Sequence, residues 1–458
     1  MRASWGVYYD RVIGATANDV DGATPGFAFP GQVFPNQAAG TDVRLSDAPV
    51  FPAPPGSPAL TPGATRTNTL AMFDPNFRTP YVMQMNFTVQ QELLRGTVLE
   101  AGYVGARGVK LLADVNMNQF KTQGAFLADF NQIAAFRRNA AAVPPGNVFV
   151  RLFGSPAAAV AAVGGTVFDQ GAINTAATTF DTNNFTRYPA AGLSDFFLRN
   201  YPQFGGLLVA TNGGRSWYDS LQVSLRRQAG AVRFSTNYTW SKSLDNISVD
   251  GAGFTSPIDN FNLRLNKGRS DVDRAHSLSW TGSYFLPFGK GRAIGGAASG
   301  WMDRIIGGWE IGALGFWTSG FTITVTSGVP TVAANTNSRA DYTGSRRIGT
   351  VQRLGNGVSY FTPEQLRNFS VPAAGEIGTS GRNTFRGPRF FNTDTSLIKR
   401  FRIHEKHAVT FRAEGYNLFN NVNFATPGIN LQTPQTFGRI SALSGGSRVV
   451  MLALRYDF

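Results

Sequence analysis

The 458-residue sequence predicts an all-β fold, an antiparallel up-and-down β-barrel that crosses a membrane with its strands. Three observations predict this fold. Apolar and polar residues alternate with a period of two over many segments, which is typical of strands with one apolar face. These segments run for about ten residues, enough for a tilted strand to cross a bilayer, whereas soluble strands average about five or six. Tight turns also alternate along the chain with long connections.

Composition excludes several other classes of protein. No apolar stretch approaches the roughly 18 residues of a membrane helix, which excludes a helical membrane protein. The absence of cysteine excludes disulfides and thiolate metal sites. The net charge of +14 suggests nucleic acid, but Lys and Arg are scattered rather than clustered, so we expect no nucleic-acid partner. The arginines instead suit the barrel wall and loops that face lipopolysaccharide, because Arg pairs well with phosphate.

The alternation defines ten strands. It is clearest in residues 83–93, where Met83, Met85, Phe87 and Val89 share one face and polar residues occupy the other. Tight turns separate successive alternating segments, which indicates hairpins. We expect strands at residues 2–12, 81–94, 97–106, 217–228, 231–242, 276–286, 308–328, 392–402, 408–418 and 448–458.

The segment 308–328 is open to two interpretations. Residues 318–320 look like a hairpin turn, but the apolar residues keep odd positions on both sides of Gly320. An unbroken phase indicates one long strand that bends at the glycine. The connection 287–307 then becomes a longer periplasmic link, with a short helix expected around Trp301 to Ile306.

The lengths of the connections predict the topology. Barrels of this class have short periplasmic turns and longer external loops, so we place the tight turns at 95–96, 229–230 and 402–407 in the periplasm. The expected external loops are 13–80, 107–216, 243–275, 329–391 and 419–447. The whole chain, residues 1–458, is thus one partial barrel. Further strands in 107–216, for example at 148–153, would bring the total to about 10–14.

Aromatic residues near strand ends predict the belts that such barrels place at the membrane surfaces. An amphipathic ring suits the boundary between hydrocarbon and water. The residues that we assign to these belts are Trp217, Tyr218, Trp240, Trp280, Tyr284 and Trp309.

Several segments resemble, in order, the C-terminal barrel of TonB-dependent receptors, specifically Oar-like barrels that often follow a carboxypeptidase-regulatory-like domain. They include residues 5–11 (WGVYYDR), 99–105 (LEAGYVG), 216–222 (SWYDSLQ), 237–244 (NYTWSKSL), 284–292 (YFLPFGKGR) and 414–420 (EGYNLFN). The resemblance implies the wall of an uptake receptor for a bulky ligand, without catalysis or a cofactor. It also implies an insertion signal, read by the barrel assembly machinery, at Val450, Leu452, Leu454, Tyr456 and Phe458.

The sequence departs from that family in what it lacks. The family's plug domain and TonB-engaging segment are not visible, and no export signal precedes Trp5. We therefore expect a fragment of a Gram-negative outer-membrane receptor, with the plug absent and the TonB system reached only through a missing N-terminal region. The alternative is a self-contained small porin or adhesin, because ten or twelve strands can close a small barrel. A barrel hydrolase is disfavoured, because three histidines offer no convincing triad.

No catalytic or metal site is expected, and the loops carry no readable code for a ligand. His404 and His407 flank a tight turn whose spacing does not aim both rings at one ion, so we interpret them as solvated turn residues. His276, at a junction of loop and strand, is interpreted as structural. Ser396 and Lys399 match the Ser-x-x-Lys pattern of penicillin-recognising enzymes, but that chemistry needs both residues on one helical turn.

Four carboxylates fall in one expected external loop: Asp245, Asp250, Asp271 and Asp273. Calcium would suit such oxygen ligands, yet no EF-hand-like spacing is present. We interpret them as parts of a polar loop in which Asp271 and Asp273 pair with Arg269 and Arg274.

Overall fold

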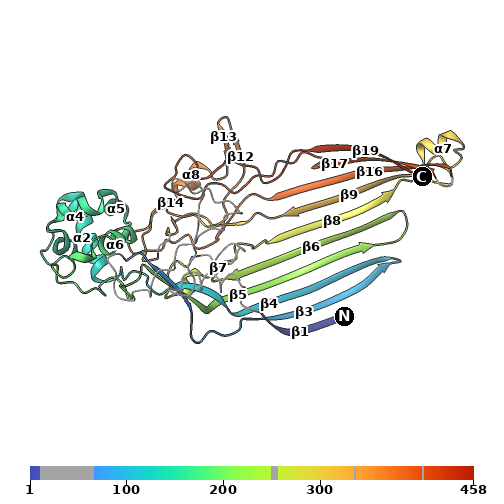
Figure 1. The fold of residues 1–458 in the computed structure, drawn as a ribbon. Coiled ribbons are helices and arrows are strands. Elements are labelled where there is room, and N and C mark those ends of the chain that lie inside the picture. Colours follow the sequence, from blue (N-terminus) through green and yellow to red (C-terminus); the bar gives the residue numbers. More distant parts are fainter. Residues whose placement is uncertain (11–65, 249–255, 335–336, 405–406) are drawn as a thin grey trace, which may run out of the picture.

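The computed structural model describes residues 1–10, 66–248, 256–334, 337–404 and 407–458. Ten long strands form one antiparallel sheet in sequence order (Figure 1). Each expected strand has a counterpart. They are β1 Arg2–Tyr9, β3 Tyr81–Leu94, β4 Thr97–Asn116, β5 Gly206–Arg227, β6 Val232–Asp245, β8 His276–Phe285, β9 Trp309–Thr318, β16 Phe390–His404, β17 His407–Tyr416 and β19 Val449–Asp457.

The sheet is an open section of a barrel. Within the described residues β1 pairs only with β3, and β19 pairs only with β17. Two short strands extend the sheet: β2, Thr69–Phe73, pairs in parallel with β5, and β7, Gly268–Arg269, pairs with β6. No helix among the described residues is long and apolar enough to cross a membrane.

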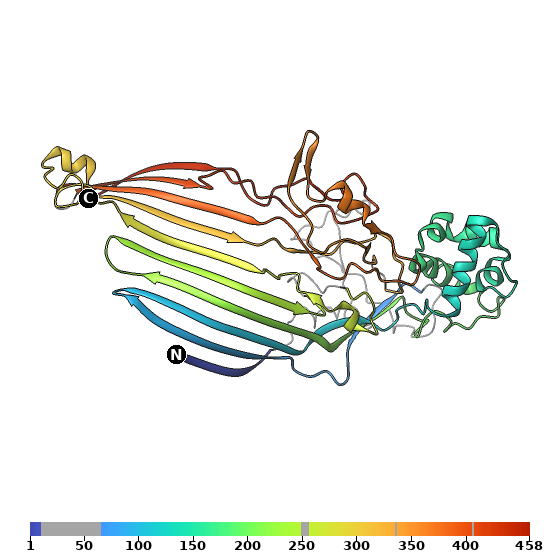
Figure 2. The same ribbon diagram turned by 180° about the vertical axis from the view of Figure 1, so that it is seen from behind.

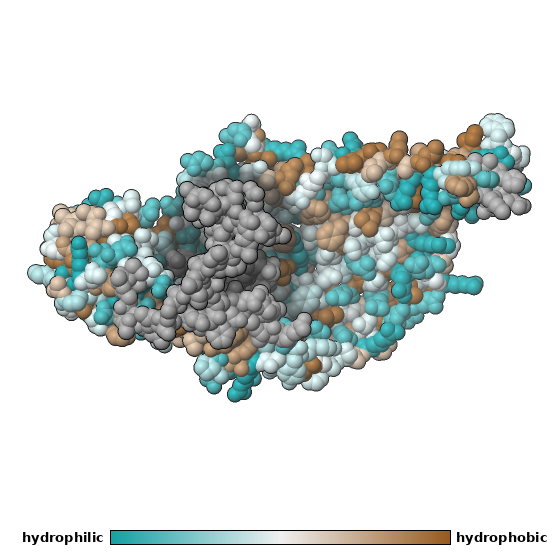
Figure 3. Space-filling model, in the orientation of Figure 1, coloured by the Kyte–Doolittle hydropathy of each residue, from teal (hydrophilic) through white to brown (hydrophobic). Residues whose placement is uncertain are grey.

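The register places apolar residues of successive strands on one face. Val223 of β5 is opposite Ala101 of β4 and Tyr238 of β6, and Tyr238 is in turn opposite Leu278 of β8. Cross-strand partners share a face and successive residues alternate between faces. Polar residues such as Gln222 therefore form the other face. In Figure 3 hydrophobic residues are conspicuous over β17 and β19, along the upper margin of the sheet.

The sheet has a turn end and a loop end. At the turn end, Gly96 and Gly230 have φ of 71° and 73°, a conformation that glycine adopts without strain, in the tight turns that follow β3 and β5. The longer link from β8 to β9 carries α7, Trp301–Ile306, which confirms the helix expected there. Both chain termini also lie at this end (Figures 1 and 2).

A helical unit stands at the loop end, between β4 and β5. It comprises α2 Ala125–Asn139, α3 Val148–Phe153, α4 Pro156–Val163, α5 Gly165–Gln170, α6 Ile173–Asp181 and the 3₁₀ helix η1 Phe185–Arg187. Its core is rich in buried phenylalanines, among them Phe126, Phe130, Phe149, Phe168 and Phe180. The expected loop 107–216 is therefore shorter than predicted, since β4 runs to Asn116 and β5 starts at Gly206.

The further strand suggested at 148–153 was wrong. That segment is the helix α3, and the Asn147 side chain caps it by accepting a hydrogen bond from the Phe149 amide at 2.9 Å. Val148, Phe149 and Leu152 face the helical core, a spacing that suits one side of a short helix. The segment is too short for its apolar residues to distinguish helix from strand.

The other long connections at the loop end share a second core. It includes Val325, Phe361, Phe369, Phe385 and Phe437. Short pairings brace it: β10 Thr322–Ile323 with β15 Phe385–Arg386, β11 Asp341–Tyr342 with β14 Phe369–Ser370, and β12 Gln352–Leu354, β13 Gly357–Ser359 and β18 Arg439–Ile440 together. The helix α8, Pro363–Arg367, starts with a capping box, and the 3₁₀ helix η2, Leu263–Asn266, precedes β7. Most of the expected loop 13–80 lies outside the described residues.

The expectation of one bent strand at 308–328 was also wrong. β9 ends at Thr318, and the chain continues in the two-residue strand β10, which pairs with β15 instead of β16. At Gly320 a Cβ atom would lie 1.8 Å from the carbonyl oxygen of Gly387, so only glycine allows this close approach. The unbroken alternation nevertheless signalled correctly that no hairpin forms there, because β9 pairs with β8 and β16 along its whole length.

Candidate functional site: the wall and its loop end

The long sheet has the two chemically distinct faces of a membrane barrel wall. In such walls the apolar face meets lipid and the polar face lines the interior. A hollow of about 650 Å³ on the polar face is lined by side chains of β1, β3 and β4, including Arg2, Asn86, Glu92 and Glu100. The fold thus defines the class of protein as an outer-membrane-type β-barrel.

The register sorts the expected belt aromatics between the two faces. Four of them lie on the apolar face, because each is opposite a residue of that face: Trp217 opposite Leu244, Trp240 opposite Leu221, Tyr284 opposite Ile311 and Trp309 opposite Lys399. Tyr218 follows Trp217 directly on the strand, so its side chain belongs to the polar face. The belt itself stays a prediction, but Tyr218 cannot share the lipid-facing row with Trp217.

Trp280 is on the apolar face but far from a strand end. It is the fifth of ten residues in β8 and is opposite Thr236 and Gly315. Its ring covers Gly315, where a Cβ atom would lie 1.9 Å from a ring carbon. Trp280 therefore fills space in the middle of the wall, and sequence position within the segment was a poor guide to its depth.

The C-terminal strand presents its apolar residues along one face, as the sequence predicts. Val450, Leu452, Leu454 and Tyr456 are opposite Gly415, Ala413, Phe411 and Val409. Tyr456 is 53% exposed and Leu454 is 74% exposed, because β19 is an edge strand of the sheet. This exposed row is available for contact with lipid or with another protein.

The candidate catalytic and metal residues are dispersed. Ser396 and Lys399 lie on opposite faces of β16, so they cannot act together. The His407 ring stacks on Tyr456, and its Nδ1 atom lies 2.6 Å from the Tyr456 hydroxyl oxygen. His276 lies 2.8 Å from the Tyr238 hydroxyl, in agreement with a structural role. Among the described residues no three His, Cys, Asp or Glu side chains converge on a metal site.

The carboxylates of the loop 243–275 hold the loop end together. Asp245 and Asp271 both accept hydrogen bonds from Arg382, at 2.6 and 3.2 Å, and Asp273 pairs with Arg386 at 2.5 Å. Among the described residues no ion pair joins Asp271 or Asp273 to Arg269 or Arg274, although the charge of Asp273 acts on both arginines and opposes the lowering of their pKa. The arginines that pair with these carboxylates come from more than 100 residues downstream, and no local pattern could have indicated them. Asp250 lies outside the described residues.

An aromatic pocket of about 360 Å³ lies where the polar face meets the loops. Phe316 and Phe390 project from the polar face of β9 and β16, with ring centroids 6.3 Å apart. The Arg274 guanidinium covers the ring of Phe321, and burial, helped by the charge of Arg386, lowers the pKa of Arg274 to about 10. Arg274 remains charged at neutral pH, so the pocket combines aromatic surface with one cation.

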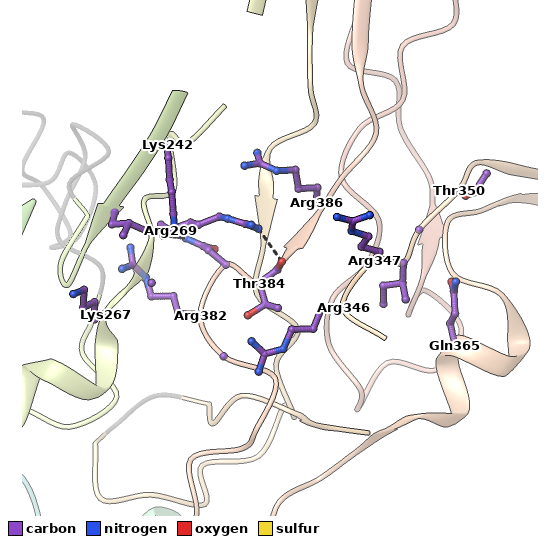
Figure 4. Close-up of a pocket in the computed structure, with 16 residues that line it drawn as sticks. Lys242, Lys267, Arg269, Arg346, Arg347, Thr350, Gln365, Arg382, Thr384 and Arg386 are labelled. Carbon is purple, nitrogen blue, oxygen red and sulfur yellow. Dashed lines mark hydrogen bonds between the residues drawn. The ribbon is translucent and has the colours of Figure 1, made fainter. Parts of the chain in front are cut away.

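A larger cavity of about 870 Å³ is strongly basic (Figure 4). Its seven cationic lining residues are Lys242, Lys267, Arg269, Arg346, Arg347, Arg382 and Arg386, and no Asp or Glu is among the described residues that line it. They come from β6, from β7 and the residue before it, from the loop at Arg346 and Arg347, and from β15 and the segment that leads into it. Sequence reasoning missed this site because the seven residues appear as single charges or pairs spread over about 145 positions.

Comparison with known proteins identifies the family. The sequence profile of the family described as outer membrane beta barrel domain matches residues 1–451. The chain therefore belongs to the outer membrane beta barrel domain family, and its place is the outer membrane. A search of curated protein sequences gives no match.

Several solved structures are similar to this chain at a low level. The outer membrane transporter YddB from Escherichia coli is 9% identical, with a TM-score of 0.36, over 86% of this chain and 34% of that one. The ferripyoverdine receptor of Pseudomonas aeruginosa is 9% identical, with a TM-score of 0.33, over 83% and 28%. The FrpB iron transporter from Neisseria meningitidis is 8% identical, with a TM-score of 0.35, over 85% and 33%. This chain thus spans about a third of the length of these proteins.

Proposed function

We propose that this chain is the C-terminal wall of a TonB-dependent receptor that takes a bulky ligand through the outer membrane without chemical change. One observation carries the proposal: ten long strands form a two-faced wall with tight turns at one end and folded loops at the other. Loops built on their own cores offer a large, ordered surface for capturing a ligand. The resemblance of segments such as 5–11 and 414–420 to Oar-like receptors supports the same function.

In this function the polar face would line the passage, and a plug domain would occupy it. The hollow beside Asn86 and Glu100 offers polar partners for such a domain. The aromatic pocket around Phe316 and Phe390 lies where a ligand would pass from the loops into the barrel. Planar or sugar-like groups with a negative charge suit its rings and Arg274.

The edges of the sheet require further strands. Open sheet edges are not tolerated in hydrocarbon, since their amide and carbonyl groups would lack partners. We infer that other strands of the receptor complete the ring between β1 and β19. The apolar row of β19, ending at Phe458, would meet the barrel assembly machinery before the ring closes.

Permeability of the full receptor tests this function. The receptor is purified from outer membranes, placed in liposomes and exposed to arabinose, with swelling as the readout. A plugged receptor should exclude arabinose, and urea at a concentration that unfolds the plug but not the barrel should admit it. Free entry of arabinose before urea treatment would indicate a passive porin and overturn the proposal. Exclusion both before and after treatment would show that the wall encloses no passage, which also contradicts it.

A further inference from the structure

The basic cavity lies at the loop-end rim of the wall and includes residues of its lipid-facing row. Lys242 is opposite Asp219, two residues beyond the apolar pair of Trp240 and Leu221 on the same face. Arg269 is opposite Leu244, which continues that face. Lys267 lies on the same face, because its ammonium is 4.4 Å from the ring centroid of Trp217, the cross-strand partner of Leu244. Lys242, Leu244 and Arg269 therefore border the membrane, whereas Gly268 is opposite Asp245 on the polar face, where Arg382 packs.

The cavity also lies at the height of lipid headgroups. Val232 starts β6 at the turn end, and Lys242 is ten residues further along. At about 3.3 Å per residue and a tilt of about 40°, ten residues rise about 25 Å, which is the height of the apolar band of such barrels. Lys242 thus marks the upper limit of the band, at the loop end that barrels of this kind expose outside the cell.

The positive charge of the cavity is only partly balanced. Arg382 and Arg386 have carboxylate partners, but the other five cations form no ion pair with a carboxylate of the described chain. Burial, and to a smaller extent the nearby charge of Arg386, lowers the pKa of Arg269, while the charge of Asp273 opposes that shift. Arg382 is 7% exposed, and its Nε atom has no hydrogen-bond partner among the described residues. The excess of cations favours an anion here.

We propose that this cavity binds the phosphate groups of lipopolysaccharide in the outer leaflet. Guanidinium groups bind phosphate through paired hydrogen bonds, and basic pockets at membrane surfaces hold anionic headgroups. Figure 4 shows Lys242 and Arg269 on the strand side and Arg346 and Arg347 on the loop across the cavity. A phosphorylated sugar headgroup between them would join loop and wall. This site depends on the outer-membrane location and not on transport, so failure of the uptake proposal would leave it standing.

Binding measurements on the full protein in detergent test the site. The probes are lipopolysaccharide with phosphorylated lipid A, the same material after enzymatic removal of phosphate, and inorganic phosphate. The variant Lys242→Gln with Arg269→Gln removes two strand-side cations, and Arg346→Gln with Arg347→Gln removes the two across the cavity. Arg226→Gln is the matched control, because Arg226 is an exposed cation of β5 opposite Ser235, on the polar face.

Each double variant should bind phosphorylated lipopolysaccharide about tenfold more weakly or worse, because two charge-assisted contacts are lost. The control and the unmodified protein should bind alike, and dephosphorylated material should bind each of them weakly. Equal binding by all variants would overturn the site. Equally tight binding of inorganic phosphate would assign the cavity to a soluble anion and refute the lipid source. Heat-modified migration on gels first confirms that each variant folds. If one double variant does not fold, the other is sufficient for the comparison with the control.

Discussion

A charge placed on the wall tests which face meets lipid. Val223→Arg puts a guanidinium on the apolar face of β5, between Ala101 of β4 and Tyr238 of β6. Tyr238 is about halfway along the apolar row of β6, so the new charge lies near the middle of the wall. Arginine near the middle of the bilayer costs a barrel about 2–4 kcal/mol. That cost lowers the folding equilibrium constant about 30- to 1,000-fold. Gln222→Arg, one residue away on the polar face, should cost less than about 1 kcal/mol, because the charge stays in a polar interior.

Reversible unfolding in guanidinium chloride, with the protein refolded into lipid vesicles, measures both costs. The migration of unheated samples on gels reports the folded fraction independently. The assignment of faces would be refuted by equal losses for the two variants, or by a larger loss for Gln222→Arg. A loss confined to Val223→Arg would fix the orientation of the entire sheet, since the register ties every strand to β5 through its neighbours.

Three further predictions concern the loops and the packing. Asp181→Asn removes the carboxylate that two buried arginines share, leaving Arg66 with Asp195 and Arg199 with none. It should cost about 3–5 kcal/mol, seen as faster proteolysis of the helical unit. Asp169→Asn breaks an exposed pair and should cost under about 1 kcal/mol. Gly315→Ala should destabilise the wall by about 1–3 kcal/mol in denaturant unfolding, and adding Trp280→Leu should restore much of it by removing the ring that the methyl group meets. Burial raises the pKa of Tyr360 to about 12. The neutral phenol therefore contributes to the free energy of unfolding below pH 10, and about 3 kcal/mol of it should be lost as pH rises from 10 to 12. Tyr360→Phe should abolish that dependence.

The strands could be predicted from sequence because their signal is local. A period of two over about ten residues reflects a single requirement, one face in lipid, that each strand meets on its own. The helix α7 was also predicted, within the longer link from β8 to β9. The prediction failed for α3, because six residues hold too few turns to reveal a helical period.

The contacts at the loop end could not be predicted in this way. Asp245 and Arg382 are 137 positions apart, and they meet because the two loop segments pack together. The basic cavity likewise exists only after β6, β7 and the segments near Arg346 and Arg382 converge. Scattered basic residues gave no clue, because neither their number nor their spacing records which of them share a surface.

The great length of β4 and β5 makes the helical unit a module. β5 has 22 residues, about 70 Å of chain, and roughly ten of them extend past the membrane-crossing part to reach the helices. The unit closes over its own phenylalanine core. Substitutions inside that core therefore need no compensating change in the wall, and the unit can be exchanged or diversified while the barrel stays intact. Surface variation under attack by phages or antibodies should then accumulate in the helices, with the sheet held constant by the bilayer.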